Sequence, residues 1–212
     1  NQWVAPDGTD IRPIIVNVGN FSKPSEGKPS LLTIDEVGTM FHEFGHALHG
    51  LLTKCHYKSV SGTSVARDFV ELPSQINENW AFQPEVLATY AFHYETGEVI
   101  PDALVAKIVA AGTFNQGFMT TELTAASILD MKWHELASVC VPADSPLASE
   151  TDCPDGDGKL IDIVKFEKQV CKEMGLIDEI IPRYRTSYFN HIFNSGYSAG
   201  YYSYLWAEVL DK

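Results

Sequence analysis

The order of polar and apolar positions predicts a mainly helical chain with a small β element near its start. The segment RPIIVNVGNF, from Arg12 to Phe21, alternates in polarity and is rich in Ile and Val, which is typical of a strand. The Pro, Gly and Ser residues of SKPSEGKPS then predict a loop. From Thr33 onward the apolar residues recur at helical spacing. We therefore expect a succession of helices after one strand.

The first long helix is predicted from Thr33 to about Lys54. Thr33 and Glu36 have the spacing of a capping box, which places the start of the helix. Gly45 lies inside the helix where a stronger helix former is expected, and this indicates close packing at that point. Apolar residues cover most of the circumference, as in a buried helix: Val37, Met40, Phe41, Phe44, Ala47, Leu48, Leu51 and Leu52.

Later segments repeat the helical pattern and contain one long interruption. DFVELPSQINENWAFQ is predicted to be helical with a start or kink near Pro73, PEVLATYAFHY is a further helix, and residues 101–138 form one or two long helices. IVKFEKQVCKEMG is an amphipathic helix that ends at Gly175. The polar residues from Val141 to Lys159 predict an exposed loop insertion. No repeat is present, so residues 1–212 are predicted to form a single domain.

Composition and charge exclude several kinds of partner. Hydrophobic residues make up 45% and charged residues 20% of the 212 positions, which is typical of a soluble globular protein. The net charge is −13, from 28 acidic and 15 basic residues. Nucleic acids and anionic membranes select for clustered Lys and Arg, so neither is expected as a partner. No apolar run approaches the roughly 18 residues of a membrane span.

The chain ends and the cysteines bear on origin and compartment. The chain begins at Asn1 without a methionine and stops in a helical segment, so we expect a fragment of a longer protein whose targeting signals could lie upstream. Its four cysteines show no CxxC spacing. We expect reduced thiols in the cytoplasm, where disulfides are rare. A bond between Cys140 and Cys153 is the alternative for an exported protein.

The stretch FHEFGHALHG carries the strongest chemical pattern. His42 and His46 are four residues apart and share one helix face, so both imidazoles can bind one metal ion. Glu43 stands beside that face, where it can take a proton from a zinc-bound water and pass it to a leaving amine. Zinc lowers the pKa of such a water to about 7. The pattern therefore predicts a zinc-dependent hydrolase with one ion per chain.

A catalytic zinc ion normally has three protein ligands, and spacing alone leaves the third open. His49 is turned by roughly 60° from the face shared by the first two histidines. Glu71 lies on a second predicted helix that could pack against the first, which makes it the better candidate. The competing residues nearby are His56, Asp68 and Glu78. Glu78 or Gln75 could instead orient His42 or His46 through a hydrogen bond.

The chain resembles the thimet oligopeptidase family of zinc peptidases. The resemblance rests on FHEFGHALHG and SGTSVARDFVELPSQINENW and continues in TAASILDMKWH and RYRTSYFNHIFNSGYSAGYYSYLWAEVL. It covers most of Ile34 to Leu210. VARDFVELPSQINE and RYRTSYFNHIF are most similar to the bacterial peptidyl-dipeptidases, also called dipeptidyl carboxypeptidases. The resemblance implies a zincin-like catalytic core, so that the single domain would be a catalytic one. The insertion from Val141 to Lys159 departs from the family.

The resemblance also implies roles for individual residues. His42, His46 and Glu71 would bind the zinc ion, and Glu43 would be the general base. Near the far end of the chain, the resemblance assigns further roles in substrate binding and transition-state stabilisation to His191, Tyr201 and Tyr204, and a substrate contact to Tyr197. Hydroxyl and imidazole donors suit the negative charge that develops on a peptide carbonyl oxygen.

In this late segment we expect Tyr201 and Tyr204 to face the metal. The remaining large side chains of the segment should pack into the protein instead: Tyr202, Leu205 and Trp206.

Three hypotheses follow for function. The first is a zinc peptidase that releases dipeptides from the C-terminus of short peptides, with Arg183 or Arg185 as a site for the free carboxylate. The second is an endo-acting oligopeptidase of the same family. The third is a folded zinc-binding fragment without turnover. Family members are considerably longer, and their N-terminal part forms the other wall of the channel, so that part is an expected partner. Without it, exposed apolar surface could cause self-association.

Overall fold

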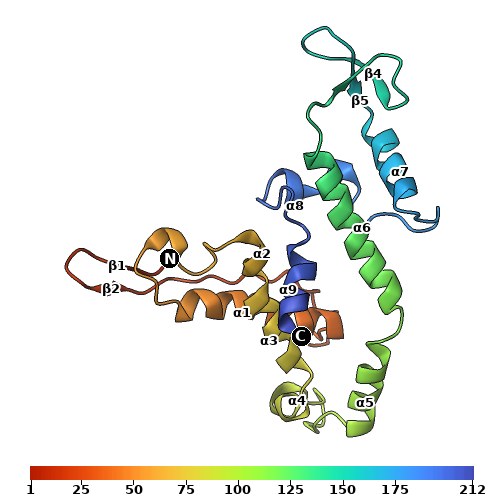
Figure 1. The fold of residues 1–212 in the computed structure, drawn as a ribbon. Helices are drawn as coiled ribbons and strands as arrows, with labels where there is room; N and C mark the ends of the chain where they lie inside the picture. Colours follow the sequence, from red (N-terminus) through yellow and green to blue (C-terminus); the bar gives the residue numbers. More distant parts are fainter. The chain divides into compact units, whose positions relative to one another are not determined.

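The computed structural model describes residues 1–212 and is mostly helical, with short strands at the start and in the middle of the chain (Figure 1). The mainly α fold predicted from the sequence is confirmed. Residues 1–114 and 206–212 form one compact unit, and residues 115–205 form a second. None of the helices has the length and apolar character needed to cross a membrane. The single catalytic domain stays a prediction.

The N-terminal β structure is smaller than predicted. Strand β1 (Trp3–Val4) pairs antiparallel with β2 (Asp10–Ile11). The predicted strand over residues 12–21 is wrong, because this segment has no partner strand to complete its backbone hydrogen bonds. Its alternating apolar residues Ile14, Val16 and Val18 are 91%, 79% and 83% exposed.

Helix α1 (Ile34–Leu52) begins where the capping box predicts. Thr33 is the N-cap, its hydroxyl accepts the Glu36 N–H at 3.2 Å, and the Glu36 carboxylate accepts the Thr33 N–H at 2.8 Å. The Glu36 carboxylate also accepts the N–H and hydroxyl of Ser22. These hydrogen bonds, led by that of the Thr33 N–H, lower the pKa of Glu36 to about 2. The start of α1 is therefore fixed by reciprocal caps, as predicted.

Only one stripe of α1 is buried, so the prediction of a helix buried all round is wrong for this chain. Phe44 is 50% and Leu52 is 71% exposed, whereas Gly45, Ala47 and Gly50 are buried. The buried stripe packs on α3 (Leu72–Ala81). A Cβ atom on Gly45 would lie 2.6 Å from Ser74 Cα and 2.7 Å from the Pro73 carbonyl oxygen. The close packing inferred from Gly45 is thus confirmed.

The rest of the first unit supports these two helices. A 3-10 turn η1 (Lys58–Val60) and a short α2 (Arg67–Val70) lead into α3, whose first turn contains Pro73, near the predicted start. Helices α4 (Pro84–Tyr90) and α5 (Asp102–Ala111) follow. At the end of the chain, α9 (Ser203–Asp211) is anchored to α3, because Asn79 Nδ2 donates to both carboxylate oxygens of Asp211 at 2.8 and 2.9 Å.

The second unit is built on α6 (Gln116–His134). It also contains α7 (Ile163–Glu173), the 3-10 turn η2 (Thr186–Tyr188) and α8 (Asn190–Phe193). Gly175 has φ +75°, its N–H bonds to the Lys172 carbonyl, and the Leu176 N–H bonds to the Cys171 carbonyl. This is a Schellman motif, which confirms Gly175 as the residue that ends α7.

The segment predicted as an exposed loop insertion contains a small sheet. Strands β3 (Cys140–Val141), β4 (Ala148–Asp152) and β5 (Lys159–Ile161) pair antiparallel in the order β3-β5-β4. A disulfide joins Cys140 to Cys153, so the expectation of reduced thiols is wrong for these two residues. Cys55 and Cys171 are free. Strands this short carry little alternation, which is why the pattern predicted only a loop.

Two apolar clusters share the buried face of α6. The first consists of Ala126, Phe189, Ile192 and Tyr201. The second consists of Leu129, Ile161, Phe166 and Val170. Trp133 packs against both clusters, and its Nε1–H donates to the Thr186 hydroxyl at 3.0 Å. One face of α6 therefore holds both α7 and the late aromatic segment in place.

Candidate functional site

Two elements of the first unit bring three potential metal ligands together. Helix α1 places His42 and His46 one turn apart, with their rings edge to face and the ring centroids 4.9 Å from each other. Glu71 is the residue between α2 and α3 and is 2% exposed. Its Oε2 atom lies 3.2 Å from Nε2 of His42 and 3.2 Å from Nε2 of His46. The ligand atoms of the three residues all lie within 4.8 Å of one another, and the group could hold a metal ion.

The two distances from Glu71 to the histidines fit a tetrahedral ion. Donors that are about 2.0–2.1 Å from a tetrahedral zinc ion are roughly 3.3 Å from each other. The two nitrogen–oxygen distances of 3.2 Å match this value. The donor set of two imidazoles and one carboxylate is also one that zinc uses in catalytic sites. The residues present therefore fit the ion that the sequence predicts.

Glu78 orients one of the imidazoles. Its Oε1 atom is 2.6 Å from His42 Nδ1, so the carboxylate accepts the Nδ1–H and leaves the lone pair on Nε2. The sequence offered Glu78 or Gln75 for this contact, and the structure confirms Glu78. Burial lowers the pKa of His42, but the hydrogen bonds of Glu71 and Glu78 outweigh it and raise this pKa to about 9. The surroundings of Nε2 thus favour a positive charge there, which a proton or a metal ion can supply.

A serine fixes the Glu71 carboxylate, and sequence reasoning missed it. Ser74 is fully buried on the first turn of α3, and its hydroxyl contacts Glu71 Oε2 at 3.1 Å and the Glu71 carbonyl oxygen at 2.7 Å. Asn77, one turn further along, donates to the Phe41 carbonyl oxygen at 2.6 Å and so ties α3 to α1. Ser74 lies three positions after a candidate ligand at the start of a helix. This spacing could have indicated its contact with Glu71.

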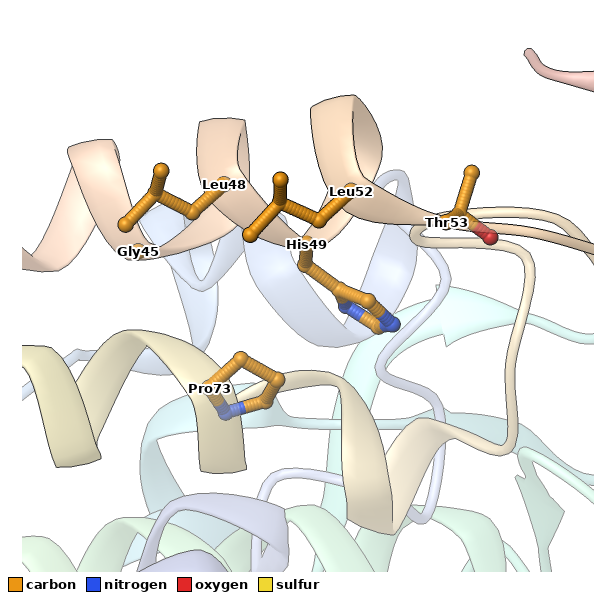
Figure 2. A pocket seen from close by; sticks show the side chains of 6 residues that line it. All are labelled: Gly45, Leu48, His49, Leu52, Thr53 and Pro73. Carbon is orange, nitrogen blue, oxygen red and sulfur yellow. The ribbon is translucent and has the colours of Figure 1, made fainter.

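The other candidates for the third ligand are not in this group. His49 instead lines a pocket of about 310 Å³ between α1 and the start of α3, together with Gly45, Leu48, Leu52, Thr53 and Pro73. Figure 2 shows its ring extending from α1 on the side where Pro73 lies. Burial, and then the neighbouring His46, lower the pKa of His49. Glu43 follows His42 on α1 and is partly buried.

The second unit gathers the four late residues predicted to contact substrate. The ring centroids of His191 and Tyr201 are 5.6 Å apart, and those of Tyr201 and Tyr204 are 5.1 Å apart. Tyr197 stacks on Tyr204 at 5.5 Å and lies edge-on to His191 at 6.0 Å. The structure therefore places all four in one aromatic cluster, and their roles stay predictions.

The prediction that Tyr202, Leu205 and Trp206 pack into the protein is wrong for Tyr202 and Trp206, whereas Leu205 is partly buried. The prediction that Tyr201 and Tyr204 face the metal stays a prediction. Tyr202 and Trp206, expected to pack, are 41% and 46% exposed, whereas Tyr201 is 3% exposed. Tyr201 is enclosed because Phe189 and Tyr184 contact its ring at centroid distances of 4.9 and 6.0 Å. Burial, and then the nearby Tyr184, raise the pKa of Tyr201. Its hydroxyl thus remains a neutral hydrogen-bond donor.

Arg185, one of two candidates for binding a peptide carboxylate, has a partner within the unit. Its Nε–H donates to Glu167, a carboxylate that is 4% exposed. Glu167 also accepts the Thr186 N–H at 2.8 Å and the Thr186 hydroxyl at 3.1 Å. Arg183 is exposed. Of the two arginines, Arg183 is therefore the better candidate for a contact with substrate.

A mainly helical chain with an HExxH helix and a glutamate between α2 and α3 is typical of the class of zincin-like metallopeptidases. The family model described as "Peptidase family M3" matches residues 5–212. The chain belongs to this family, as the resemblance predicted.

Individual relatives support the same family membership. The chain is 46% identical over 200 residues to "Dipeptidyl carboxypeptidase" of Escherichia coli (strain K12), an alignment that spans 93% of this chain and 27% of that protein. It is 45% identical over 202 residues to "Dipeptidyl carboxypeptidase" of Salmonella typhimurium, spanning 95% and 27%. It is 40% identical over 215 residues to "Oligopeptidase A" of Salmonella typhimurium, spanning 99% and 28%. The chain thus spans little more than a quarter of the length of these relatives.

Proposed function

We propose that the protein containing this chain is a zinc-dependent peptidase that releases dipeptides from the C-terminus of short peptides. One Zn²⁺ ion per chain would be held by His42, His46 and Glu71. The observation that carries the proposal is the position of Glu71 Oε2, which lies 3.2 Å from Nε2 of each histidine on the HExxH helix. Membership of the M3 peptidase family supports the same reaction class.

Each group has a role that its chemistry permits. An ion held by His42, His46 and Glu71 would supply a Lewis acid for the water and the peptide carbonyl. Glu43, next to His42 on α1, accepts the proton of the attacking water and passes it to the leaving amine. His191, Tyr201 and Tyr204 donate hydrogen bonds to the carbonyl oxygen as it gains negative charge, and Tyr197 contacts the substrate.

Similarity favours dipeptide release over endo-acting cleavage. The two relatives named dipeptidyl carboxypeptidase are 46% and 45% identical, whereas the relative named oligopeptidase A is 40% identical. Exposed Arg183 supplies a guanidinium for the free carboxylate of a substrate. Peptides with a free and with an amidated C-terminus separate the two modes. Equal cleavage of both would exclude the dipeptide-releasing mode and favour the oligopeptidase.

A second candidate function concerns the isolated chain, which in this alternative folds and binds zinc without turnover. It spans 27% of the dipeptidyl carboxypeptidases, and α1 exposes apolar residues such as Phe44 and Leu52. We propose that the remainder of the protein is the partner of this surface and that the chain alone self-associates. Sedimentation of the isolated chain and of the full-length protein tests this. A monomeric isolated chain would contradict it.

The cysteines bear on the compartment of the protein. The disulfide between Cys140 and Cys153 supports an oxidising compartment, since such bonds are rare in the cytoplasm. The predicted cytoplasmic location remains the alternative. Alkylation without reduction, followed by mass spectrometry of the peptides that contain Cys140 and Cys153, decides between them: unalkylated cysteines support export and alkylated cysteines support the cytoplasm.

Glu43→Gln in the full-length protein tests the central proposal. The substitution removes the general base but none of the three proposed ligands, so kcat should fall by about 10²–10⁴-fold while one zinc ion per chain is retained. Glu85→Gln on α4 is the matched control, because Glu85 is exposed and outside the site. Unchanged activity of Glu43→Gln, or wild-type protein that binds no zinc, would overturn the proposal.

A further inference from the structure

Asp130 is a fully buried carboxylate that the proposed chemistry does not use. It lies on α6, within the stretch TAASILDMKWH, and is 0% exposed. Its Oδ1 atom accepts the Ala199 N–H at 2.9 Å, and its Oδ2 atom accepts the Tyr201 N–H at 2.8 Å. His134, one turn further along α6, places Nδ1 2.8 Å from Oδ1. Both oxygens are thus bound to a segment about seventy residues away in the sequence.

The segment that Asp130 holds has an unusual backbone conformation. Ala199 has φ +50°, a left-handed conformation that residues with a side chain seldom adopt because Cβ crowds the following carbonyl. The Gly200 N–H closes the turn on the Tyr197 carbonyl at 2.8 Å, and the Ser198 hydroxyl donates to the Ile192 carbonyl at 2.6 Å. The two N–H groups on either side of Gly200 both point at one carboxylate. This arrangement compensates for the unfavourable conformation of Ala199.

The turn determines where the Tyr201 side chain starts. Tyr201 donates its own N–H to Asp130, and its ring packs against those of Phe189 and His191, with centroid distances of 4.9 and 5.6 Å. Two residues later α9 begins, which carries Tyr204. A change in the turn would therefore displace both tyrosines at once. The rings around Tyr201 constrain its side chain, but among the contacts described only Asp130 fixes its N–H.

We infer that Asp130 is a positioning residue, which clamps the turn from Ala199 to Tyr201 and thereby presents the Tyr201 hydroxyl to the substrate. The inference rests on the proposed function, because it takes Tyr201 as a donor in peptide hydrolysis. Asp130 touches neither substrate nor metal in this role and acts only through the backbone of the turn. An asparagine cannot replace it, since the amide offers one acceptor where the turn needs two.

The test uses the full-length protein with Asp130→Asn and a matched control. Asp162→Asn is that control: Asp162 also accepts two backbone N–H groups in the second unit, from Val164 and Lys165, but both reach one oxygen that asparagine keeps. We expect Asp130→Asn to lower kcat by about 10–100-fold with a smaller change in KM. Deuterium uptake by the peptide spanning residues 198–204 should become faster than in the wild type. Asp162→Asn should leave kcat, KM and this uptake unchanged.

A double-mutant cycle with Tyr201→Phe separates positioning from general support of the fold. Tyr201→Phe alone should lower kcat by about 10²–10³-fold, as expected for loss of a transition-state donor. In that background Asp130→Asn should change kcat by no more than about twofold, since the group it positions is already absent. An equal fold loss in both backgrounds, or unchanged uptake in Asp130→Asn, would overturn the inference.

The outcomes also separate this inference from the proposed function. If the wild-type protein cleaves peptides and Tyr201→Phe retains full kcat, the inference fails and the peptidase stands. If the wild type cleaves no peptide, the proposed function fails and the exchange measurement still tests the clamp. Should Asp130→Asn not fold, the same measurements are made on Asp130→Asn combined with Ala199→Gly, because glycine adopts positive φ without steric cost.

Discussion

Two buried carboxylates, one in each compact unit, have opposite surroundings. Asp130 is 0% exposed and accepts two backbone N–H groups. Glu71 is 2% exposed, but one of its oxygens faces the Nε2 atoms of two histidines. A buried negative charge must be compensated by donors or cations. Two backbone N–H groups compensate Asp130 permanently, with His134 Nδ1 also 2.8 Å from its Oδ1 atom, whereas compensation of Glu71 by imidazole nitrogens requires a proton or an ion between them. Burial alone therefore does not identify a carboxylate as a metal ligand. The groups that contact the carboxylate do.

Zinc removal should distinguish the two carboxylates most clearly. In the proposed site, free zinc at about 1,000 times its Kd should raise the free energy of unfolding of the wild type by about 4 kcal/mol over the chelated protein. Glu71→Gln removes the charged ligand, so most of this increment should be lost, whereas Asp130→Asn should retain it. Denaturant unfolding with zinc and with chelator measures both. An undiminished increment in Glu71→Gln would exclude Glu71 as a ligand.

Asp130→Asn should have the next largest effect, and this effect should not depend on zinc. The amide leaves one buried N–H of the turn facing another donor, which costs about 1–3 kcal/mol. The loss in free energy of unfolding should be equal with zinc and with chelator, because the backbone of the turn and His134 are the partners of Asp130 in both conditions. Asp162→Asn is the control, since asparagine caps helices as well as aspartate does. A loss confined to the zinc-loaded protein would contradict the claim that Asp130 stabilises the fold independently of zinc.

Glu78→Gln should have a smaller effect, restricted to the metal site. Glu78 accepts the Nδ1–H of His42 at 2.6 Å and so keeps the Nε2 lone pair directed away from itself. Replacing such an orienting carboxylate weakens metal affinity by about 10–100-fold. Competition with a chromophoric zinc chelator measures the change, with exposed Glu85→Gln as the reference. Unaltered affinity would mean that the Glu78 contact does not orient the ligand.

The sequence predicted the elements that depend on local chemistry. The capping box at Thr33, the packing glycine at position 45 and the C′ glycine at position 175 are all confirmed, because each depends on residues a few positions apart. The alternation from Arg12 to Phe21 predicted a strand wrongly, since a strand also needs a partner that the pattern does not reveal. The burial of α1 was overestimated because an apolar face shows what could be covered, not what covers it.

The candidate site was predictable to a similar extent. His42 and His46 follow from helical spacing, but Glu71 was one of several acids until the resemblance selected it. The structure now places it within 3.2 Å of both histidines. Ser74 and Asp130 were missed because a serine in a helix start and an aspartate in an apolar helix are common. Asp130 gains its meaning from residues that lie about seventy positions later, and no local pattern contains that relation.

Ala199→Gly should produce the smallest effect and shows how much of the turn depends on the clamp. The left-handed conformation at φ +50° costs a residue with a side chain about 1–2 kcal/mol, and glycine avoids this cost. Glycine also gives the unfolded chain more freedom, which offsets about 0.4–1 kcal/mol. The net gain in free energy of unfolding should thus lie between about 0 and 1.6 kcal/mol while Asp130 is present. It should be larger in the Asp130→Asn background, where the turn has lost one of its acceptors. Equal gains in both backgrounds, measured by denaturant unfolding, would mean that the carboxylate does not stabilise the conformation of Ala199.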